Sequence, residues 1–474
     1  MSPVPTQPST SYPVEGEVGR FTIAGHEVAD GNGGTLRTRD LFPKLQGRQL
    51  YCTAGFKELA LLLGVTDASF RKETTKLNRL RRQQEGGIAP TTLRDISERE
   101  GAKVVACWVA TAGDILEEHG FSQDVGSCDT SSRADAEAPS VAPTLIAGEH
   151  LNEAMATAKI PEDLLTSAQA NPIPYDRPED VVEIGVDAVL AKKQKEDRAR
   201  STGDSSAAQE EPRKATLCAA NSDQEQSPGA STAAVNQPAE QVHEDRRDGK
   251  KPRPRVSNKV ATIRQDGQSY TMVAATYAVV LTFVLAFLLR NGLRDRAICF
   301  FVDGERCLKN AIMARFKWLS SVRVILDWHH LDKKCGEVLS SAIKGRKLRN
   351  EHWEQLKRLL WYGAVPKAIA YLEAIDITQI KDQRALQSLV GYLKKHQDEI
   401  PCYAVRKQLG LRNSSNLVEK ANDLSVSSRQ KHNGMSWSSE GSLGLAAITT
   451  IRMNHHEETW LDHGCMPLQF AKAA

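Results

Sequence analysis

A short apolar segment between two polar tracts limits the fold of this chain more than any other feature. It reads DVVEIGVDAVLAKKQK at residues 180–195, and its apolar residues alternate as in a half-buried strand. The flanking tracts, 125–175 and 196–257, are rich in small, polar or charged residues and are typical of linkers or surface insertions. Because one strand is not stable alone, this strand must pair across the second tract with a segment that follows it.

The segments after the second tract read first as two strands and then as alternating strands and helices. Residues 258–280 are strand-like, and an Asp-Gly pair inside them is a hairpin turn signal. Residues 297–316 and 322–343 each begin as an apolar strand, reach an acid and continue as a helix, and amphipathic helical patterns dominate from 350 to about 401. The sequence therefore predicts an α/β fold, with a mixed sheet flanked by helices and an all-helical insertion.

One uncharged run has the length of a membrane span. Residues 272–289 read MVAATYAVVLTFVLAFLL, and eighteen residues reach the lower limit for crossing a bilayer. The first half is rich in β-branched residues, and the run directly continues a strand-like segment. A central strand leading into a buried helix therefore fits better, and we expect no membrane partner.

Length, charge and cysteine usage set broad limits on the class of protein. A chain of 474 residues is long enough for two or three units, each with its own core. The 62 Lys and Arg residues against 59 Asp and Glu leave a net charge of only +3, so a surface that binds a polyanion must be local. The nine cysteines are scattered singly and no secretory signal is recognisable, which favours a cytoplasmic location.

A candidate DNA-binding motif lies near the N-terminus. Residues 56–82 read FKELALLLGVTDASFRKETTKLNRLRR, as two helices that are broken at Gly64-Val65, with Thr66 or Asp67 able to cap the second helix. This spacing is typical of a helix-turn-helix, whose second helix enters a DNA groove. A plain helical hairpin with a solvated basic face is the alternative. The candidates for DNA contact are Ser69, Arg71, Lys72, Lys76 and Arg79.

Three aspartates follow apolar strands and are candidates for chemistry. Asp187, Asp303 and Asp327 each stand where a strand is expected to end, and acids there point into the crevice in which α/β sheets bind ligands. Each one alone is as well explained as a cap of the helix that follows. Several carboxylates together, however, suit two Mg²⁺ ions that activate an attacking oxygen and stabilise a leaving oxygen in phosphodiester chemistry.

At the level of longer motifs, the chain resembles bacterial insertion-sequence transposases of the DDE class, of the Kra-type group. The resemblance covers about residues 180–461 and is interrupted by the polar insertion. The segments that carry it include VDAVLAKKQKEDR at 186–198, FFVDGERCLKNAI at 300–312, ILDWHHLDKKCGEVLSSAIKGRKLRN at 325–350, and NLVEKAND within 400–442.

The resemblance implies an RNase H-like catalytic core and assigns its acids. The first two would be Asp187 and Asp303, and the third would be Glu419, from a helix that follows an all-helical insertion. Together they would hold two Mg²⁺ or Mn²⁺ ions. Asp327 and His330 match the family's acid-x-x-His signature, in which the His orients a phosphate or leaving group and the Asp supports it. The rival assignment makes Asp327 a metal ligand and leaves Asp187 structural.

The residues after Glu419 suggest a second DNA contact. Basic and aromatic side chains follow it closely, which suits a surface that contacts backbone phosphate and an unpaired base. The alternative is a solvated helix face followed by a loop. The residues concerned are Lys420, Arg429, Lys431, His432 and Trp437.

The expected function is that of a transposase that binds the terminal inverted repeats of its element, cuts phosphodiester bonds and joins the 3′-hydroxyl to target DNA. Double-stranded DNA and further copies of the chain, in a dimer or larger synaptic complex, are the implied partners, in the cytoplasm at the nucleoid. A DNA-binding regulator without catalysis and an RNase H-like nuclease without strand transfer are the alternatives. The expected domains are a flexible 1–45, a helical DNA-binding 46–124, a linker 125–178, a catalytic core 179–345 with the insertion 196–257, a helical insertion 346–412, and a C-terminal core part 413–474.

Overall fold

The structure is a computed structural model. It describes residues 10–16, 19–25, 27–29, 35–37, 51–66, 69–82, 87–121, 145–194, 254–319, 321–431 and 435–471. The chain divides into two units, and every element named below belongs to the unit formed by Met1–Gln194 and Arg255–Ala474.

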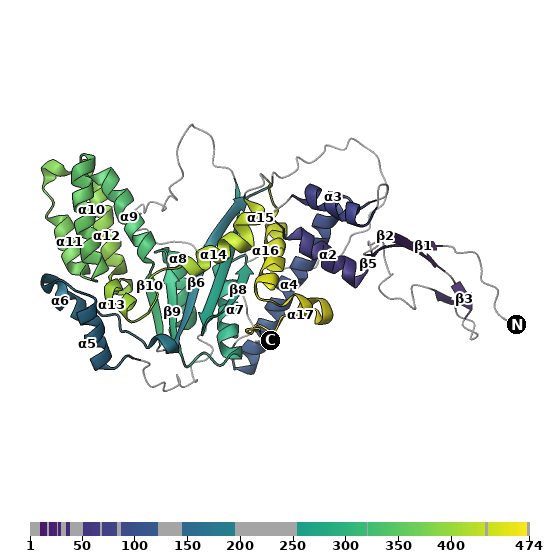
Figure 1. The fold of residues 1–474 in the computed structure, drawn as a ribbon, viewed down its shortest axis with the longest axis horizontal. Coiled ribbons are helices and arrows are strands. Elements are labelled where there is room, and N and C mark those ends of the chain that lie inside the picture. The colour runs from purple at the N-terminus through teal and green to yellow at the C-terminus, as the bar shows by residue number, and fades with distance from the viewer. Residues whose placement is uncertain are drawn as a thin grey trace, which may run out of the picture. The chain divides into compact units, whose positions relative to one another are not determined.

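A five-stranded mixed sheet forms the centre of this unit (Figure 1). Its strands run in the spatial order β10-β9-β6-β7-β8, with β6 antiparallel to β7, β7 antiparallel to β8, and β6, β9 and β10 parallel. The predicted pairing across the polar tract is confirmed, although the second strand begins inside that tract. The strands are β6 (Val181–Lys192), β7 (Arg255–Gln265), β8 (Gln268–Ala274), β9 (Ala297–Val302) and β10 (Val322–Leu326).

The predicted hairpin turn joins β7 to β8. Asp266 and Gly267 both have positive φ, 48° and 81°, and they connect Gln265 to its partner Gln268. A two-residue turn of this type matches the right-handed twist of the strands, and Asp-Gly is one of the pairs that adopt it most readily.

The uncharged run is a strand followed by a buried helix, as predicted. Thr276 caps the N-terminus of α7 (Tyr277–Arg290), and the ten residues 280–289 are all buried. The strand β8, however, lies at the edge of the sheet and not at its centre. Among the described residues, no helix combines the length and the apolar character that a membrane crossing requires.

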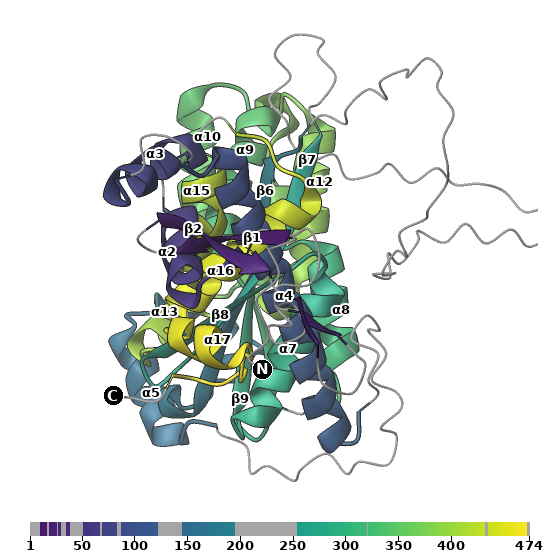
Figure 2. The ribbon, with the colours of Figure 1, turned by 90° about the vertical axis from the view of Figure 1, so that its right-hand side faces the viewer.

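Helices cover both faces of the sheet. On β7, Asn258 bonds Ser442 of α16 (Ser439–Met453), whereas the ammonium of the next residue, Lys259, lies over the ring of Tyr277 of α7. Successive side chains of a strand point to opposite faces, so α16 and α7 cover opposite faces. The long α4 (Pro90–Glu118) packs on both helices, and Figures 1 and 2 show it beside α16.

A block of helices lies in sequence between β10 and the helices of the C-terminal part of the chain. Its helices are α9 (Trp328–Ala342), α10 (Arg346–Trp361), α11 (Val365–Glu373), α12 (Gln383–His396) and α13 (Tyr403–Gln408). It is followed by α14 (Asn416–Asn422), a π-helical turn at Asp423–Ser427 and α15 (Ser428–Gln430). The order of these segments agrees with an all-helical insertion between β10 and the helix that carries Glu419.

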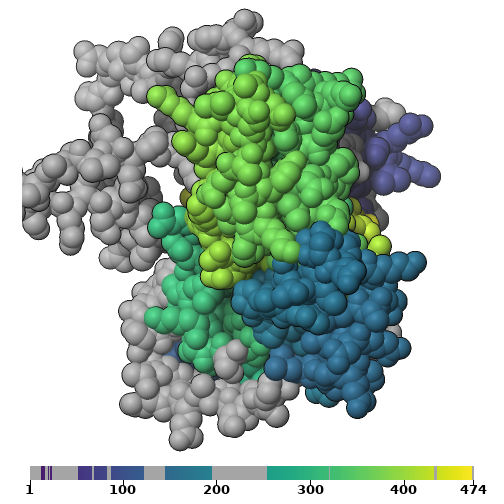
Figure 3. All heavy atoms as spheres, turned by 90° about the vertical axis from the view of Figure 1, so that its left-hand side faces the viewer, coloured from purple at the N-terminus to yellow at the C-terminus, as the bar shows by residue number. Residues whose placement is uncertain are grey.

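Two segments differ from their predictions. Residues 145–178, for which a linker was predicted, contain α5 (Gly148–Thr157) and α6 (Glu162–Gln169), and the apolar side chains of Leu164 and Ala168 are buried. In Figure 3 the blue surface that includes these helices borders the green surface of the helical block, where α5 contacts α13.

The second difference lies in the N-terminal segment, which was predicted to be flexible. It contains β1 (Thr10–Gly16) and β2 (Gly19–Gly25), which join β5 (Tyr51–Cys52), and the short pair β3 (Glu27–Ala29) and β4 (Thr35–Arg37). Glu15 of β1 is fully buried and accepts hydrogen bonds from Arg81 and Arg20, each at 2.5 Å. This buried ion pair attaches the strand to the helices that follow: α2 (Ala54–Gly64) and α3 (Phe70–Leu80). The remaining helices are α8 (Arg306–Phe316) and α17 (Glu457–His463).

Candidate active site

The three aspartates lie at one level of three neighbouring strands. Gly185 pairs with Phe301, so two residues further along the register Asp187 stands beside Asp303. Leu326 pairs with Val302, so the next residues in register are Asp327 and Asp303. The predicted position of Asp187 was wrong in one respect. It does not end its strand, because β6 continues to Lys192 in its pairing with β7 and passes the point where β9 stops.

Asp187 is held by hydrogen bonds to both carboxylate oxygens. The amide of Ala188 donates to Oδ1 at 2.6 Å, and Nδ2 of Asn422 donates to Oδ2 at 2.5 Å. Burial raises the pKa of Asp187, the hydrogen bond from Ala188 opposes this, and the negative charge of Asp303 raises it again. Asp187 and Asp303 therefore interact electrostatically across the two strands.

Asp303 occupies the exposed turn between β9 and α8. Its Oδ1 accepts a hydrogen bond from the amide of Glu305 at 2.9 Å. Gly304 between them has a φ of 91°, and a side chain there would meet the hydroxyl of Tyr392 from α12 at 2.6 Å. The turn thus requires glycine for its backbone conformation and for the close approach of the helical block.

Glu419 reaches the site because its helix packs directly on β6. A Cβ on Gly185 would lie 2.7 Å from the Cβ of Val418, so the absence of a side chain at Gly185 lets α14 approach the strand. The side chain of Glu419 is 48% exposed, and its Oε1 lies 3.9 Å from Nε2 of His330. The structure therefore brings Glu419 and His330 close to each other.

Asp327 is fully buried and its carboxylate is saturated by protein donors. Oδ1 accepts from the amide of His330 at 2.8 Å and lies 3.2 Å from Nδ1 of the same residue. Oδ2 accepts from the backbone amide of Ser415 and, at 2.9 Å, from its hydroxyl. Burial alone would raise the pKa of Asp327, but the hydrogen bonds from His330 and Ser415 outweigh it and lower the pKa to about 2.

Asp327 in turn controls the charge of His330. The contact with the Asp327 carboxylate raises the pKa of His330, burial opposes this, and the charges of Asp303 and Glu419 add to the increase. Nδ1 of the imidazole lies 3.2 Å from Oδ1 of Asp327, and Nε2 lies 3.9 Å from Oε1 of Glu419. Hydrogen bonds reach both carboxylate oxygens of Asp327, as they do those of Asp187, so this geometry does not decide between a supporting role for Asp327 and the rival assignment as a metal ligand.

The oxygen donors of Asp187, Asp303 and Glu419 fit a hard divalent cation. Mg²⁺ is usually bound by one or two carboxylates and keeps several waters, so the acids need not touch one another. Within the described parts of the chain, no three His, Cys, Asp or Glu side chains are gathered closely enough to enclose an ion. The donor set is nevertheless chemically suited to Mg²⁺ or Mn²⁺.

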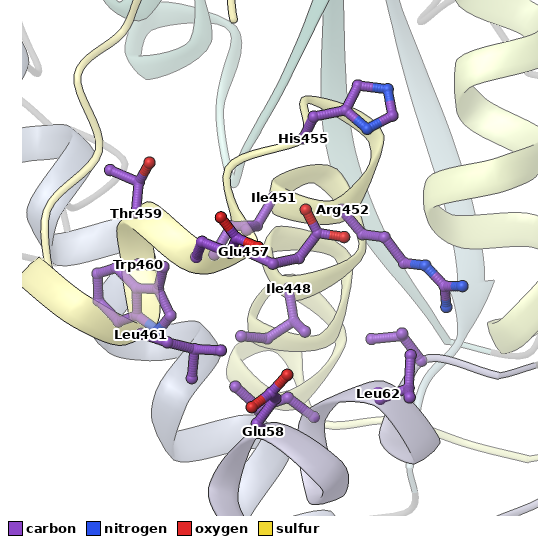
Figure 4. Close-up of a pocket in the computed structure, with 13 residues that line it drawn as sticks. Glu58, Leu62, Ile448, Ile451, Arg452, His455, Glu457, Thr459, Trp460 and Leu461 are labelled. Atoms are coloured by element: carbon purple, nitrogen blue, oxygen red, sulfur yellow. The ribbon is translucent and has the colours of Figure 1, made fainter. Parts of the chain in front are cut away.

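A pocket of about 520 Å³ lies elsewhere, between α2, α16 and α17 (Figure 4). Leu62, Ile448 and Trp460 are among its lining residues, and none of the three acids lines it. Of the three acids, Asp303 and Glu419 are exposed.

The predicted helix pair at residues 56–82 exists, with a different cap. Ser69 and not Thr66 caps α3, accepting a hydrogen bond from the amide of Lys72 at 3.4 Å, while Thr66 donates to the carbonyl of Leu63. The other proposed cap, Asp67, lies outside the described residues. Four of the predicted DNA contacts are exposed along α3, namely Arg71, Lys72, Lys76 and Arg79.

The second predicted DNA surface is only partly exposed. Lys420 and Lys431 are exposed, and His432 lies outside the described residues. The expectation of exposure was wrong for Arg429 and Trp437, which are 1% and 2% exposed.

The buried Arg429 and Trp437 join α15 to the helix pair. The guanidinium of Arg429 lies 4.4 Å from the ring centre of Phe70, the first residue of α3, and 5.6 Å from that of Trp437. Its Nε donates to the carbonyl of Gly64 at the end of α2. The two side chains therefore have a packing role between elements that are distant in sequence.

Sequence reasoning missed two residues that contact the acids. Asn422 lies three residues after Glu419 on the same face of a helix, a spacing that could have indicated it. Ser415, which binds Asp327, precedes that helix, but only the tertiary structure shows that it meets Asp327.

No protein-family model, curated protein or solved structure matches the chain. The residues and their geometry are therefore the basis on which a function is proposed.

Proposed function

We propose that the protein is a DNA transposase of the DDE class with an RNase H-like catalytic core. The strand order supports this. If the strands β6 to β10 are numbered 1 to 5 along the chain, their order across the sheet is 5-4-1-2-3. Strands 1, 2 and 3 pair antiparallel, and strands 4 and 5 run parallel to strand 1, which suits an RNase H-like sheet. The helical block between β10 and α14 agrees with the family's helical insertion, and the acids occur in the family's order.

The observation that carries the proposal is the register of β6 and β9. It sets Asp187 beside Asp303, while Val418 against Gly185 holds the helix of Glu419 over the same strand. Asp187 and Glu419 each lie 116 positions from Asp303 in sequence (303 − 187 and 419 − 303), and the elements that carry the three acids pack together at one end of the sheet. Carboxylates from two adjacent strands and a later helix are what phosphodiester chemistry with two metal ions needs.

The roles of the residues follow from their contacts. Asp187, Asp303 and Glu419 would hold two divalent ions, which when bound activate the attacking oxygen and stabilise the leaving oxygen. Asp327 fixes the ring of His330 and raises its pKa, so the imidazolium form persists to higher pH beside the site. A cation at this position favours binding of an anionic phosphate next to Glu419.

A cleavage assay with DNA that carries the terminal repeats of the element tests the proposal. With Mg²⁺, the protein should nick labelled end DNA and join the 3′-hydroxyl to a second DNA. Asp303→Asn and Glu419→Gln should abolish both products, because each removes a ligand charge. The matched controls Asp295→Asn and Glu354→Gln alter exposed residues outside the site and should retain activity.

Each other outcome contradicts the proposal in a different way. Cleavage without joined products would indicate a nuclease, and DNA binding without cleavage would indicate a regulator. Cleavage that survives Asp303→Asn would show that the chemistry does not depend on these acids.

The exposed face of α3 is the proposed contact with double-stranded DNA. Replacing Arg71, Lys72 and Arg79 together by Gln should weaken binding to end DNA and reduce the slope of log K against log salt by about 0.9 for each phosphate that is no longer neutralised. Fluorescence anisotropy at several salt concentrations measures this. Arg294→Gln, at a half-buried position after α7, should change neither the affinity nor the slope. An unchanged slope in the triple variant would exclude α3 as the phosphate-binding helix.

Because two ends must be cut together, a second copy of the chain is the further proposed partner.

A further inference from the structure

Asn422 contacts Asp187 and lies on the same helix as Glu419. It lies on α14, three residues after Glu419, and its Nδ2 donates to Oδ2 of Asp187 at 2.5 Å. The residue is only 7% exposed. Side chains three apart on a helix share a face, so Glu419 and Asn422 are presented to the same end of the sheet.

The carbonyl oxygen of this carboxamide, Oδ1, has no hydrogen-bond partner within the part of the chain that the structure describes. Oδ1 of Asn422 is buried and accepts no hydrogen bond from the described residues. A buried acceptor without a partner is rare in native proteins, and a bound ion, a water or a catalytic role is among its explanations. Oδ1 belongs to the same planar carboxamide as Nδ2, the atom that binds the Asp187 carboxylate.

The backbone at this point is also unusual. The π-helical turn Asp423–Ser427 begins directly after Asn422. Single π-helical turns within α-helices are frequent at functional sites, where they change which side chains share a face.

We propose that Asn422 is a fourth oxygen ligand of the metal site, a proposal that rests on the proposed function. Its Oδ1 binds the divalent ion held by Asp187, while its Nδ2 keeps the Asp187 carboxylate in place. An amide carbonyl is a hard oxygen donor that suits Mg²⁺ and Mn²⁺. Because it is neutral, it adds no repulsion to the Asp187 carboxylate, which already lies near the charge of Asp303.

Calorimetric titration of the full chain with Mn²⁺ tests this without any activity measurement. Asn422→Leu removes both amide atoms and should weaken Mn²⁺ binding by about 10-fold to 100-fold. Asn422→Asp keeps an oxygen at this position and should bind Mn²⁺ at least as tightly as the wild type. Asn416→Leu and Asn416→Asp are the matched controls, at an exposed position of the same helix, and should leave the affinity unchanged.

The pattern of results separates the two proposals. The inference is overturned if Asn422→Leu binds Mn²⁺ as tightly as the wild type. It is also overturned if Asn422→Asp weakens binding as much as Asn422→Leu, since then only the N–H donor matters. If the wild type and Asp303→Asn bind Mn²⁺ equally well, the metal site of the proposed function is itself wrong. Thermal unfolding without metal confirms that each variant is folded.

Discussion

Asp187 lies inside β6 and Asp327 directly follows β10, and their carboxylates have different environments. Asp187 lies beside the charge of Asp303, and burial raises its pKa. Asp327 receives hydrogen bonds from His330 and Ser415, which lower its pKa to about 2. A carboxylate saturated by protein donors is suited to hold a neighbouring side chain, whereas one beside a second acid is suited to share a cation.

We predict that Asp327→Asn destabilises the protein by about 2 kcal/mol at neutral pH. The new amide nitrogen would face the N–H and hydroxyl donors of Ser415, which then lack an acceptor. Folding lowers the pKa of Asp327, so its ionised carboxylate stabilises the folded protein above the unfolded pKa of 3.8. This stabilisation is lost as the pH falls towards the folded pKa of about 2. Urea unfolding at several pH values measures the difference, which should shrink over that range.

Asp382→Asn is the control for this prediction. Asp382 also caps a helix, α12, but it is exposed, and its carboxylate accepts hydrogen bonds from the amides of Arg384 and Ala385 in the first turn of that helix. Asn caps helices about as well as Asp, so little change is expected. An equal loss of stability in both variants would mean that capping, and not the contact with Ser415, explains the effect.

The contact between β6 and α14 decides whether Glu419 reaches the other acids. Only glycine at 185 leaves room for Val418, and the helix that follows continues through the π-helical turn to the buried Arg429. Arg429 then packs on Phe70 of α3. The helix of Glu419 is thus fixed at one end on the sheet and at the other on the proposed DNA-binding helices.

We expect Gly185→Ala to cost about 1–3 kcal/mol of unfolding free energy, because the new methyl group overlaps Val418. It should also reduce DNA cleavage by moving Glu419. The double variant Gly185→Ala with Val418→Ala should recover part of both losses. Chemical denaturation and the cleavage assay measure the two effects.

Gly391→Ala provides the comparison. A methyl group at this position of α12 meets nothing within 4 Å, and Ala favours a helix, so stability should rise by about 0.5–1 kcal/mol. If Val418→Ala fails to rescue Gly185→Ala, the steric explanation is incorrect.

The sheet of the whole molecule is built from segments on both sides of residues 195–253, which lie outside the described residues. Lys192 pairs with Arg255, so the chain leaves and re-enters the sheet at adjacent positions of β6 and β7. Gln194 still bonds the backbone of Trp437 before the chain leaves. The sheet contacts therefore do not require the intervening 59 residues (253 − 195 + 1).

Replacing residues 195–253 by a flexible linker of about six residues should preserve the fold. Closing a shorter loop costs less entropy, and the chain should become more stable by up to about 2 kcal/mol. Urea unfolding of both proteins measures this. A large loss of stability would show that the replaced segment contributes to the folded core, contrary to the expectation.

Much of the fold could be predicted from the sequence because the signals are local. Alternating apolar residues identified β6, the Asp266-Gly267 pair identified the hairpin, and the length of the uncharged run indicated a strand and a buried helix. The three aspartates were found because they belong to or follow apolar segments, whereas Glu419 was assigned through the family resemblance. These features depend on neighbours within a few residues, which the sequence contains directly.

The remaining features depend on segments that are distant along the chain. Nothing near Arg429 or Trp437 in sequence indicates burial, since their partner Phe70 comes from α3. Asp187 lies within its strand because β7, beyond the polar tract, extends the pairing past the end of β9. Asn422 touches Asp187 only because Gly185 admits α14. The sequence by itself determined the elements and the candidate acids, whereas the tertiary structure decided which side chains meet, because packing brings together residues that share no local pattern.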